Sequence, residues 1–261
     1  MRKTAESATM GMLTIHKERE RAIMLEMGQL LTEGKGKRVY ATSDPEKAIV
    51  YFKDEAMAYH GLKRGRILGK GEVNNAVCRH IYEMLESHGV ETHFIRQLDA
   101  RQSLIKRVEM IPITLKVRNR VAGSLTRRIG LPVGTRLEEP VVECNLKDEE
   151  LECPLINESH IRALKLATRE EMAFINRTAL KINDILTDYM KEIGIELIDF
   201  QLEFGRFHGK ILLADEISAD TSRFWDAHTH EPLDIDRFRR DLGNVEQAYQ
   251  ELLHRMMGME D

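Results

Sequence analysis

Residues 198–204 alternate strictly between apolar and polar side chains, and this pattern constrains the fold more than any other stretch. Successive side chains of a β-strand point to opposite faces, so the alternation predicts a strand with one apolar and one polar face. Residues 205–209 are predicted to form a short hairpin loop, and the apolar return strand ends in Asp215 and Glu216. The apolar face would carry Ile198, Phe200, Leu202 and Phe204, and the polar face Asp199, Gln201 and Glu203.

This predicted hairpin brings several carboxylates together at one end of a sheet. Crowded carboxylates raise each other's pKa unless a cation intervenes, and oxygen ligands suit magnesium, which takes one or two protein carboxylates together with substrate phosphates. An ordinary half-solvated strand explains the same alternation. The continuation favours the metal interpretation, because Arg223 and Trp225, the single tryptophan, follow the acidic cluster directly.

The order of the remaining elements predicts an α+β fold with a largely antiparallel sheet. The clearest helix is preceded by a capping-box signature at Thr168 and Glu171 and is ended by Gly194. A hairpin closed around residues 43–45 is expected near the start. Helices are expected over 74–88, 169–193 and 236–257 and weakly over 20–31, and strands over 48–52, 93–95, 103–108 and 111–119.

Composition excludes several classes of function. The chain has 261 residues, of which 42% are hydrophobic and 31% charged, as expected of a globular protein with a sizeable core. Its net charge of -4 gives no general attraction to nucleic acid or anionic membranes, and neither a membrane-spanning run nor a signal peptide is expected. Cys78, Cys144 and Cys153 form no CxxC pair, so zinc is not expected and reduced thiols in the cytoplasm fit best.

Three segments combine glycine with basic or amide side chains: Gly34–Lys37, Gly69–Asn75 and Arg118–Ser124. Glycine lets backbone N–H groups approach a phosphate, lysine supplies a point charge, and arginine supplies a planar fork. Neither the Walker A spacing nor GxGxxG is present. Each segment alone is equally typical of a solvated surface turn.

Seven segments occur together, in order, from about residue 27 to the C-terminus: Glu33–Tyr40, Lys70–Gly71 with Asn74–Asn75, Glu109–Pro112, Val117–Ser124, Ile198–Gly205, Ala214–Ser218 and Arg223–Asp226. This combination resembles the phosphoribosylaminoimidazole-succinocarboxamide synthase (SAICAR synthetase) family. The combination is highly specific, although each segment alone is not.

The resemblance implies a fold with mostly antiparallel sheets in two lobes, flanking helices and an ATP cleft between the lobes. An N-terminal extension would cover residues 1–26, a glycine-loop lobe 27–109, and a larger lobe with the metal and ribotide site 110–261. The family joins L-aspartate to the carboxylate of carboxyaminoimidazole ribotide (CAIR), using ATP and magnesium and giving SAICAR, ADP and phosphate in de novo purine biosynthesis. The chain would be a cytoplasmic homo-oligomeric ligase acting on these small molecules, with neither nucleic acid nor membrane as partner.

The resemblance also implies a role for each matching residue. Asp220 would lie near the imidazole or a second metal, and transfer of the γ-phosphoryl group to the CAIR carboxylate would give an acyl phosphate that the aspartate amine attacks. Catalysis would fall to Lys37, Asp215 and Asp220, and magnesium would be held by Glu203 and Asp215. Nucleotide contacts would come from Lys35, Gly36, Lys37, Lys106, Glu109, Met110 and Lys147, and ribotide contacts from Arg118, Ser124 and Arg223.

The chain departs from the family pattern at three places. Gln201 stands where the family commonly has lysine, so one cationic contact near the nucleotide is absent or moved. Ala219 replaces a common proline, and residues 52–58 lack a threonine often found there. None of these changes removes an expected metal or ribotide ligand.

Two further hypotheses compete with the ligase. A regulatory module that retains the ATP site but has lost turnover would have Gln201 as its lesion. A structural antiparallel domain with solvated acids would bind no nucleotide. Magnesium-dependent ADP formation that needs both CAIR and aspartate separates the first of these from an active ligase.

Overall fold

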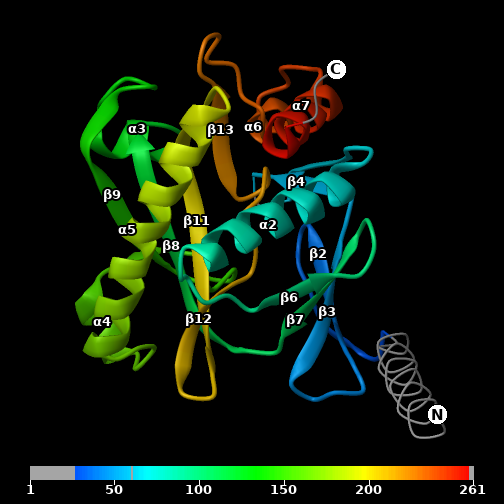
Figure 1. The fold of residues 1–261 in the computed structure, drawn as a ribbon. Coiled ribbons are helices and arrows are strands. Elements are labelled where there is room, and N and C mark those ends of the chain that lie inside the picture. Colours follow the sequence, from blue (N-terminus) through cyan, green and yellow to red (C-terminus); the bar gives the residue numbers. More distant parts are fainter. Residues whose placement is uncertain (1–26, 60, 259–261) are drawn as a thin grey trace, which may run out of the picture.

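A computed structural model describes residues 27–59 and 61–258. Figure 1 shows how their helices and strands are arranged. The expected extension over 1–26 and most of the weak helix over 20–31 lie outside the described residues. Leu30 and Leu31, which that helix would have included, instead form a strand antiparallel to residues 38–40. Pairing with the neighbouring strand therefore overrides the weak local helical pattern.

One sheet is built from residues before Arg107 in the order β1-β2-β3-β7-β6, with every neighbouring pair antiparallel. The hairpin expected around residues 43–45 joins β2 to β3. Helix α2 packs against this sheet and begins at Lys70, four residues before the expected start, because Gly69 supplies a left-handed cap at φ 78°. The elements are β1 (Leu30–Glu33), β2 (Lys37–Ala41), β3 (Lys47–Phe52), β4 (Glu55–Ala58), β5 (Lys63–Arg66), α2 (Lys70–Ser87), β6 (Phe94–Gln97) and β7 (Gln102–Lys106).

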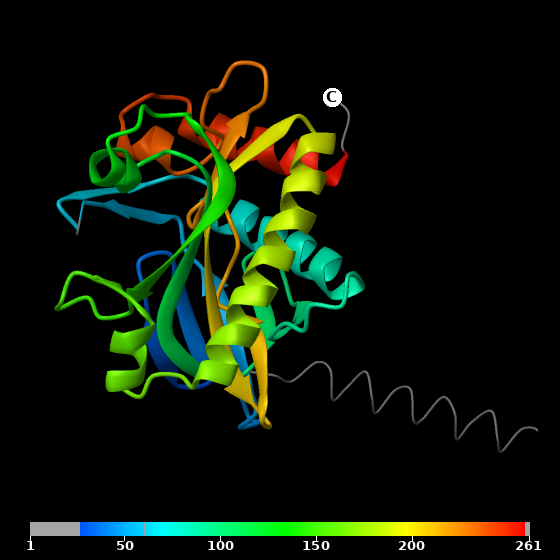
Figure 2. The ribbon, with the colours of Figure 1, turned by 90° about the vertical axis from the view of Figure 1, so that its left-hand side faces the viewer.

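The second sheet is built from residues after Val108, in the order β10-β9-β8-β11-β12, with β13 also paired to β11. All of these pairs are antiparallel. Figure 2 shows α5 running alongside the twisted strands of this sheet. The elements are β8 (Glu109–Arg120), α3 (Ser124–Ile129), β9 (Arg136–Leu146), β10 (Leu155–Ile156), α4 (Glu158–Ala163), α5 (Arg169–Glu192), β11 (Ile195–Phe207), β12 (Lys210–Ala214), β13 (Ser222–Asp226), α6 (Asp236–Arg239) and α7 (Val245–Met257).

Strand β11 is the central strand of the second sheet and contains the alternating segment. Its apolar face packs into the main core, where Phe200, Leu202 and Phe204 are each at most 1% exposed. Ile198, expected on the same face, instead packs with Ala122 and Trp225, because the register shifts between Leu197 and Asp199. The polar face is also buried, since Asp199 is 5% and Glu203 8% exposed. The half-solvated strand that the alternation alone allows is therefore wrong, because other parts of the molecule cover the polar face as well.

Helix α5 closes over the apolar side of the second sheet as its periodicity predicts. Met172, Ile175, Ile182 and Leu186 lie in the same core cluster as the apolar face of β11. The capping box at Thr168 is formed in both directions, which fixes where the helix begins. The expected site is thus left to the polar side of the sheet.

Two expected connections differ from the structure. Strand β11 continues to Phe207, and the loop expected over 205–209 shrinks to a turn at His208 and Gly209, both with positive φ as tight hairpins prefer. The single helix expected over 236–257 is split into α6 and α7, because Asp241, Gly243 and Asn244 adopt left-handed conformations that a continuous helix does not admit.

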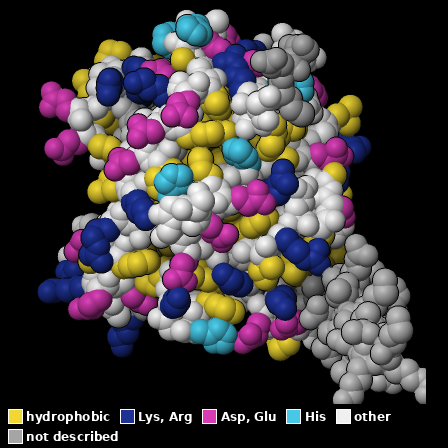
Figure 3. All heavy atoms as spheres, in the orientation of Figure 1, with side chains coloured by type: hydrophobic (Ala, Val, Ile, Leu, Met, Phe, Trp, Pro, Cys, Tyr) yellow, Lys and Arg dark blue, Asp and Glu magenta, His cyan; other side chains and the backbone are white. Residues whose placement is uncertain are grey.

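The fold class is α+β with antiparallel sheets, as expected. The two sheets are joined where Leu213 of β12 exchanges backbone hydrogen bonds with the segment before β6: its N–H donates to Glu91 and its carbonyl accepts from His93. None of the helices within the described residues is long and apolar enough to cross a membrane. On the face drawn in Figure 3, acidic and basic side chains are interspersed, in keeping with the small net charge.

Candidate active site

Acidic side chains within β11 and directly after β12 meet lysines from two other parts of the chain. Glu203 lies opposite Ala214 in the strand pair, so Asp215 follows directly beside it, held at a left-handed φ of 64°. Lys37 of β2 donates to Asp215 at 2.6 Å and lies 2.9 Å from Glu216. Lys147, just after β9, pairs with Glu203. We call Lys37, Lys147, Glu203, Asp215 and Glu216 the acid–lysine cluster.

Burial and mutual repulsion set the protonation behaviour of this cluster. Burial, aided by the charge of Asp215, raises the pKa of Glu203, and burial likewise raises the pKa of Glu216. Burial also acts to raise the pKa of Asp215, but the charges of Lys37 and Lys147 outweigh it and hold that pKa below its ordinary value. Burial opposes the charge on Lys37, and its two acidic partners raise its pKa nonetheless. The carboxylates are thus kept in place by cations from outside their own strands.

The donor set suits an ion that brings further oxygen ligands with it. Within the described residues no group of three metal-ligating side chains is arranged around a common point. Glu203 on β11 nevertheless lies beside Asp215, the residue that follows β12, and two carboxylates are what magnesium takes from a protein when phosphates and water complete its shell. The expected pair is therefore brought together, with Lys37 and Lys147 occupying its oxygens.

Asp220 is held by partners that sequence reasoning did not assign to it. Lys70, whose side chain is fully buried, donates to its Oδ2 at 2.5 Å, and the hydroxyl of Tyr249 donates to its Oδ1 at 2.7 Å. A Cβ on Gly36 would lie 3.1 Å from the same Oδ2, so the glycine turn passes directly over this carboxylate. Asp220 therefore anchors α2, α7 and the glycine turn at one point.

A second group of charges lies on the same face of β11, four residues away at Asp199. Arg118 of β8, directly opposite, donates to Asp199 at 3.0 Å and to Glu143 of β9 at 2.8 Å. Arg223 of β13 donates to both oxygens of Asp199, at 2.9 and 2.8 Å, and to Asp236 at 2.8 Å. We call Arg118, Glu143, Asp199, Arg223 and Asp236 the arginine cluster.

The two arginines of this cluster differ in access. The side chain of Arg118 is 2% exposed and that of Arg223 16%. A Cβ on Gly123 would lie 2.7 Å from Nη2 of Arg223, which places the backbone before Ser124 against that guanidinium. The expected ribotide residues are brought together, with Arg223 accessible and Arg118 buried behind it as a support for Asp199.

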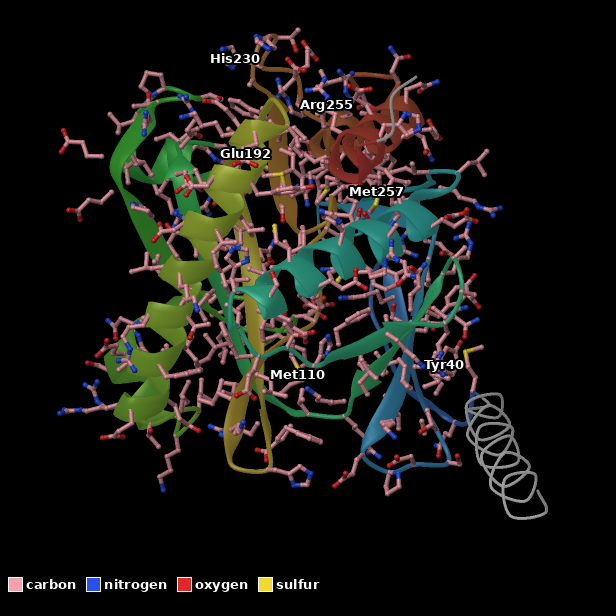
Figure 4. The ribbon with its side chains drawn as sticks, viewed as in Figure 1. Tyr40, Met110, Glu192, His230, Arg255 and Met257 are labelled. Carbon is pink, nitrogen blue, oxygen red and sulfur yellow. The ribbon has the colours of Figure 1, made fainter. Side chains whose placement is uncertain are left out.

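The remaining nucleotide candidates lie at the ends of strands or in the turn before β2. Lys35 is exposed and lies 2.9 Å from Glu149, and Lys106 donates to the carbonyl of Thr92 at 2.9 Å. Glu109, at the start of β8, faces solvent and lies 3.4 Å from Arg206. Figure 4 labels Met110, 36% exposed, beside it at the beginning of β8. Within the described part of the chain, none of these side chains forms a hydrogen bond or ion pair with the acid–lysine cluster, and Glu109 meets Arg206, which is bound by Glu171 of α5.

Sequence reasoning missed several side chains of the site. Tyr249, Glu143 and Asp236 give no local signal, because each meets its partner only through the tertiary fold. Lys116 could have been found, since Thr114, Lys116 and Arg118 alternate with the apolar Ile113, Leu115 and Val117 along β8. That alternation places Lys116 on the face shared by both clusters.

Comparisons with known proteins agree on one family. A family model described as SAICAR synthetase matches residues 30–256. The phosphoribosylaminoimidazole-succinocarboxamide synthase of Clostridium acetobutylicum is 48% identical over 234 residues, covering 90% of this chain and 100% of that protein. The crystal structure of the corresponding Ehrlichia chaffeensis synthase superposes with a TM-score of 0.86 at 38% identity, covering 89% of this chain and 100% of that one. A SAICAR synthetase solved in complex with ADP has a TM-score of 0.86 at 44% identity, covering 88% and 98%. The chain belongs to the SAICAR synthetase family.

Proposed function

We propose that this chain condenses CAIR with L-aspartate at the expense of ATP, through an acyl phosphate formed between its acid–lysine and arginine clusters. Its family makes it a ligase of de novo purine biosynthesis. The observation that carries the proposed site is the placement of both clusters on one face of β11, at Glu203 and Asp199. The acid–lysine cluster is suited to a metal-bound triphosphate, and the arginine cluster is suited to a phosphate monoester.

Magnesium would be held by Glu203 and Asp215. When bound, it neutralises charge on the triphosphate and so eases attack by an anion. Lys37 and Lys147, which now neutralise these two acids, would turn to the phosphate oxygens. Lys35 and Gly36 would cover the phosphates, and Lys106, Glu109 and Met110 would border the adenine. This exchange keeps the buried charges balanced in both states.

The ribotide phosphate would be bound by Arg223, with Ser124 beside it and Arg118 holding Asp199 in place behind. A carboxylate oxygen of CAIR then attacks the γ-phosphorus, forming an O–P bond while the bond to the leaving ADP breaks. The amine of aspartate attacks the acyl carbon, forming the C–N bond. Phosphate leaves with one former carboxylate oxygen, and the nitrogen loses its proton. Positioning and charge neutralisation supply most of the rate enhancement for such steps.

Oxygen-18 placed in the CAIR carboxylate tests this route. We expect one label in each phosphate released, with ADP formation that requires magnesium, CAIR and aspartate together. The matched control is oxygen-18 water, which should put no label into phosphate. Turnover with unlabelled phosphate from labelled CAIR would rule out the acyl phosphate. Nucleotide binding without ADP formation would instead favour a regulatory module that has lost turnover.

The division into lobes, the cellular location and the oligomeric state belong to the same proposal. We place the division between a glycine-loop lobe and a larger lobe near residues 109–110, where the first sheet ends and β8 begins the second. A cytoplasmic, homo-oligomeric enzyme fits three thiols that are free in the structure and substrates that are soluble metabolites. Sedimentation of the purified chain would test the oligomeric state directly.

A further inference from the structure

Lys116 lies between the two clusters on the site face of β8. It is opposite Gln201 on β11 and opposite Glu143 on β9. On β8 itself it lies two residues from Arg118 and two from Thr114, whose hydroxyl donates to Glu203 at 3.2 Å. Two residues of strand span about 6.8 Å, so Lys116 stands midway between the arginine cluster and the acid–lysine cluster.

Lys116 has no partner within the described part of the chain. It makes no hydrogen bond or ion pair there, although its side chain is half-buried. Glu143, its neighbour on one side, is already held by Arg118 and by Arg128 at 2.7 Å. Gln201, its neighbour on the other side, is uncharged. Burial lowers the pKa of Lys116, and the charge of Arg118 adds to that effect.

A half-buried cation whose nearest carboxylates, Asp199 and Glu143, are already paired with arginines is unfavourable, and an incoming anion removes that cost. The environment of Lys116 holds more cations than free anions: Arg118, Arg223 and Arg239 act on it, and Asp199 is shared by two arginines. The space beside Lys116 is therefore prepared for an anionic group of a substrate.

The position also accounts for the uncharged residue at 201. Directly opposed residues of an antiparallel pair have Cβ atoms about 4.5–5.5 Å apart, well within the reach of a lysine side chain. A lysine at 116 can thus bring its ammonium group to the space that a lysine at 201 would reach. The cationic contact that Gln201 lacks is moved across the strand pair.

We propose that Lys116 binds the carboxylate of the ribotide substrate, the group that is phosphorylated, and so supplies at the reacting centre the positive charge that Gln201 lacks. This inference rests on the proposed function, because it takes the ribotide phosphate to lie at Arg223 and the triphosphate at the acid–lysine cluster. A carboxylate between those two ends lies beside Lys116. The amino-acid substrate and the γ-phosphate are the two other sources of anionic oxygen there.

Three variants of the full chain test the proposal: Lys116→Met, Gln201→Lys and the double variant that carries both changes. Methionine keeps the length of the side chain and removes its charge, and the double variant moves the charge back across the strand pair. Lys210→Met is the matched control, since it removes an exposed lysine whose partner is Glu91. The measurements are CAIR binding by calorimetry without ATP or aspartate, steady-state constants for each substrate, and the thermal midpoint.

We expect Lys116→Met to weaken CAIR binding by about 10–100-fold, the range for a hydrogen bond between charged groups. The KM for ATP and for aspartate should stay within about twofold, since neither is bound by this contact. The double variant should recover CAIR binding to within about fivefold of wild type, a rescue that a merely structural lysine would not show. Lys210→Met should match wild type throughout.

Several outcomes would overturn the proposal. CAIR binding unchanged in Lys116→Met would show that no carboxylate is bound there, and a loss confined to ATP or to aspartate would assign the lysine to another anion. A Lys116→Met chain that fails to fold, with a double variant that folds no better, would make the lysine structural. A wild-type chain with no turnover would instead reject the proposed function, which separates the two failures.

Discussion

The two clusters on β11 neutralise their carboxylates in different ways. In the arginine cluster, planar guanidinium groups bind acids that belong to the same sheet or to the segment following it, and Arg118 is buried among them. In the acid–lysine cluster, single ammonium groups arrive from β2 and from the loop after β9, and Lys147 is 45% exposed. We infer that the first is a fixed arrangement and that the second exchanges most readily at Lys147, since Lys37 is only 15% exposed.

This difference matches the substrates that we assign to each end. A phosphate monoester can dock onto a prebuilt guanidinium without rearranging it, because Asp199 already fixes the planar fork. A metal and a triphosphate must displace the cations already present, and lysines move more easily than paired arginines. Preorganisation at one end and exchange at the other are therefore encoded by the choice between arginine and lysine.

Removing Arg118 should have the largest effect. Arg118→Met removes the buried cation that Asp199 and Glu143 share. We therefore expect the free energy of unfolding to fall by about 3–5 kcal/mol in urea titrations. Arg128→Met is the matched control: it removes a more exposed partner of the same Glu143 and should cost less than about 1 kcal/mol. Similar losses in the two variants would mean that the arginine cluster is not a fixed arrangement.

Asp215→Asn should affect activity more than stability. The amide keeps the shape and removes one charge of the proposed magnesium pair, so we expect kcat/KM at limiting magnesium to fall about 100-fold, about 2.7 kcal/mol of transition-state stabilisation. Raising magnesium should recover part of this loss. Wild-type activity at low magnesium would remove Asp215 from the metal site.

The two clusters should respond oppositely to acid. The charges of Arg128 and Arg118 overcome burial and lower the pKa of Glu143 below its ordinary 4.5, so the stability it adds is present above pH 4.5 and lost as pH falls through its folded pKa. Burial raises the pKa of Glu203, so its charged form costs stability at neutral pH and that cost disappears as pH falls towards 4.5. Unfolding titrations across pH should therefore show Glu143→Gln less stable and Glu203→Gln more stable than wild type at pH 7. Both differences should shrink in acid, and parallel curves would contradict the contrast.

Lys147→Met should have the smallest effect on the fold. Its ion pair with Glu203 is partly solvated, so we expect a change of less than about 1 kcal/mol in the free energy of unfolding. The same variant should need less magnesium for half-maximal activity, since Glu203 loses a competitor. A stability loss as large as that of Arg118→Met would make this end of β11 as fixed as the other.

Local sequence signals predicted the elements that frame the site. The alternation of β11, the capping box of α5 and the acids after β12 depend on neighbours within a few residues. The structure contains the capping box, the acids and the alternation from Asp199 to Phe204, but not its continuation to Ile198. The pairing of Lys37 with Asp215 joins residues 178 apart, and no local pattern reports it. The resemblance brought both residues to notice, without saying that they bind each other.

The predictions that were wrong failed for the same reason, because they depended on contacts between distant parts of the chain. Alternation cannot distinguish a solvated polar face from one covered by another part of the chain, so the burial of Asp199 and Glu203 was invisible. The hairpin turn and the break between α6 and α7 depend on positive φ at His208 and Asn244, which non-glycine residues adopt only when the surroundings favour it. Lys116 is the exception, since the alternation of β8 displays it and only its lack of a partner needed the structure.

The arginine cluster also sets an order of assembly. Arg118 and Asp199 are 81 residues apart and Arg223 lies a further 24 residues on, so the network closes only when β13 pairs with β11 near the end of the chain. Closing such long loops is slow, because the entropy of the intervening chain is lost before any contact forms. On the ribosome, Arg118 is synthesised long before Asp199 and Arg223 emerge, so we expect the end of the site that we assign to the ribotide to be completed late in folding.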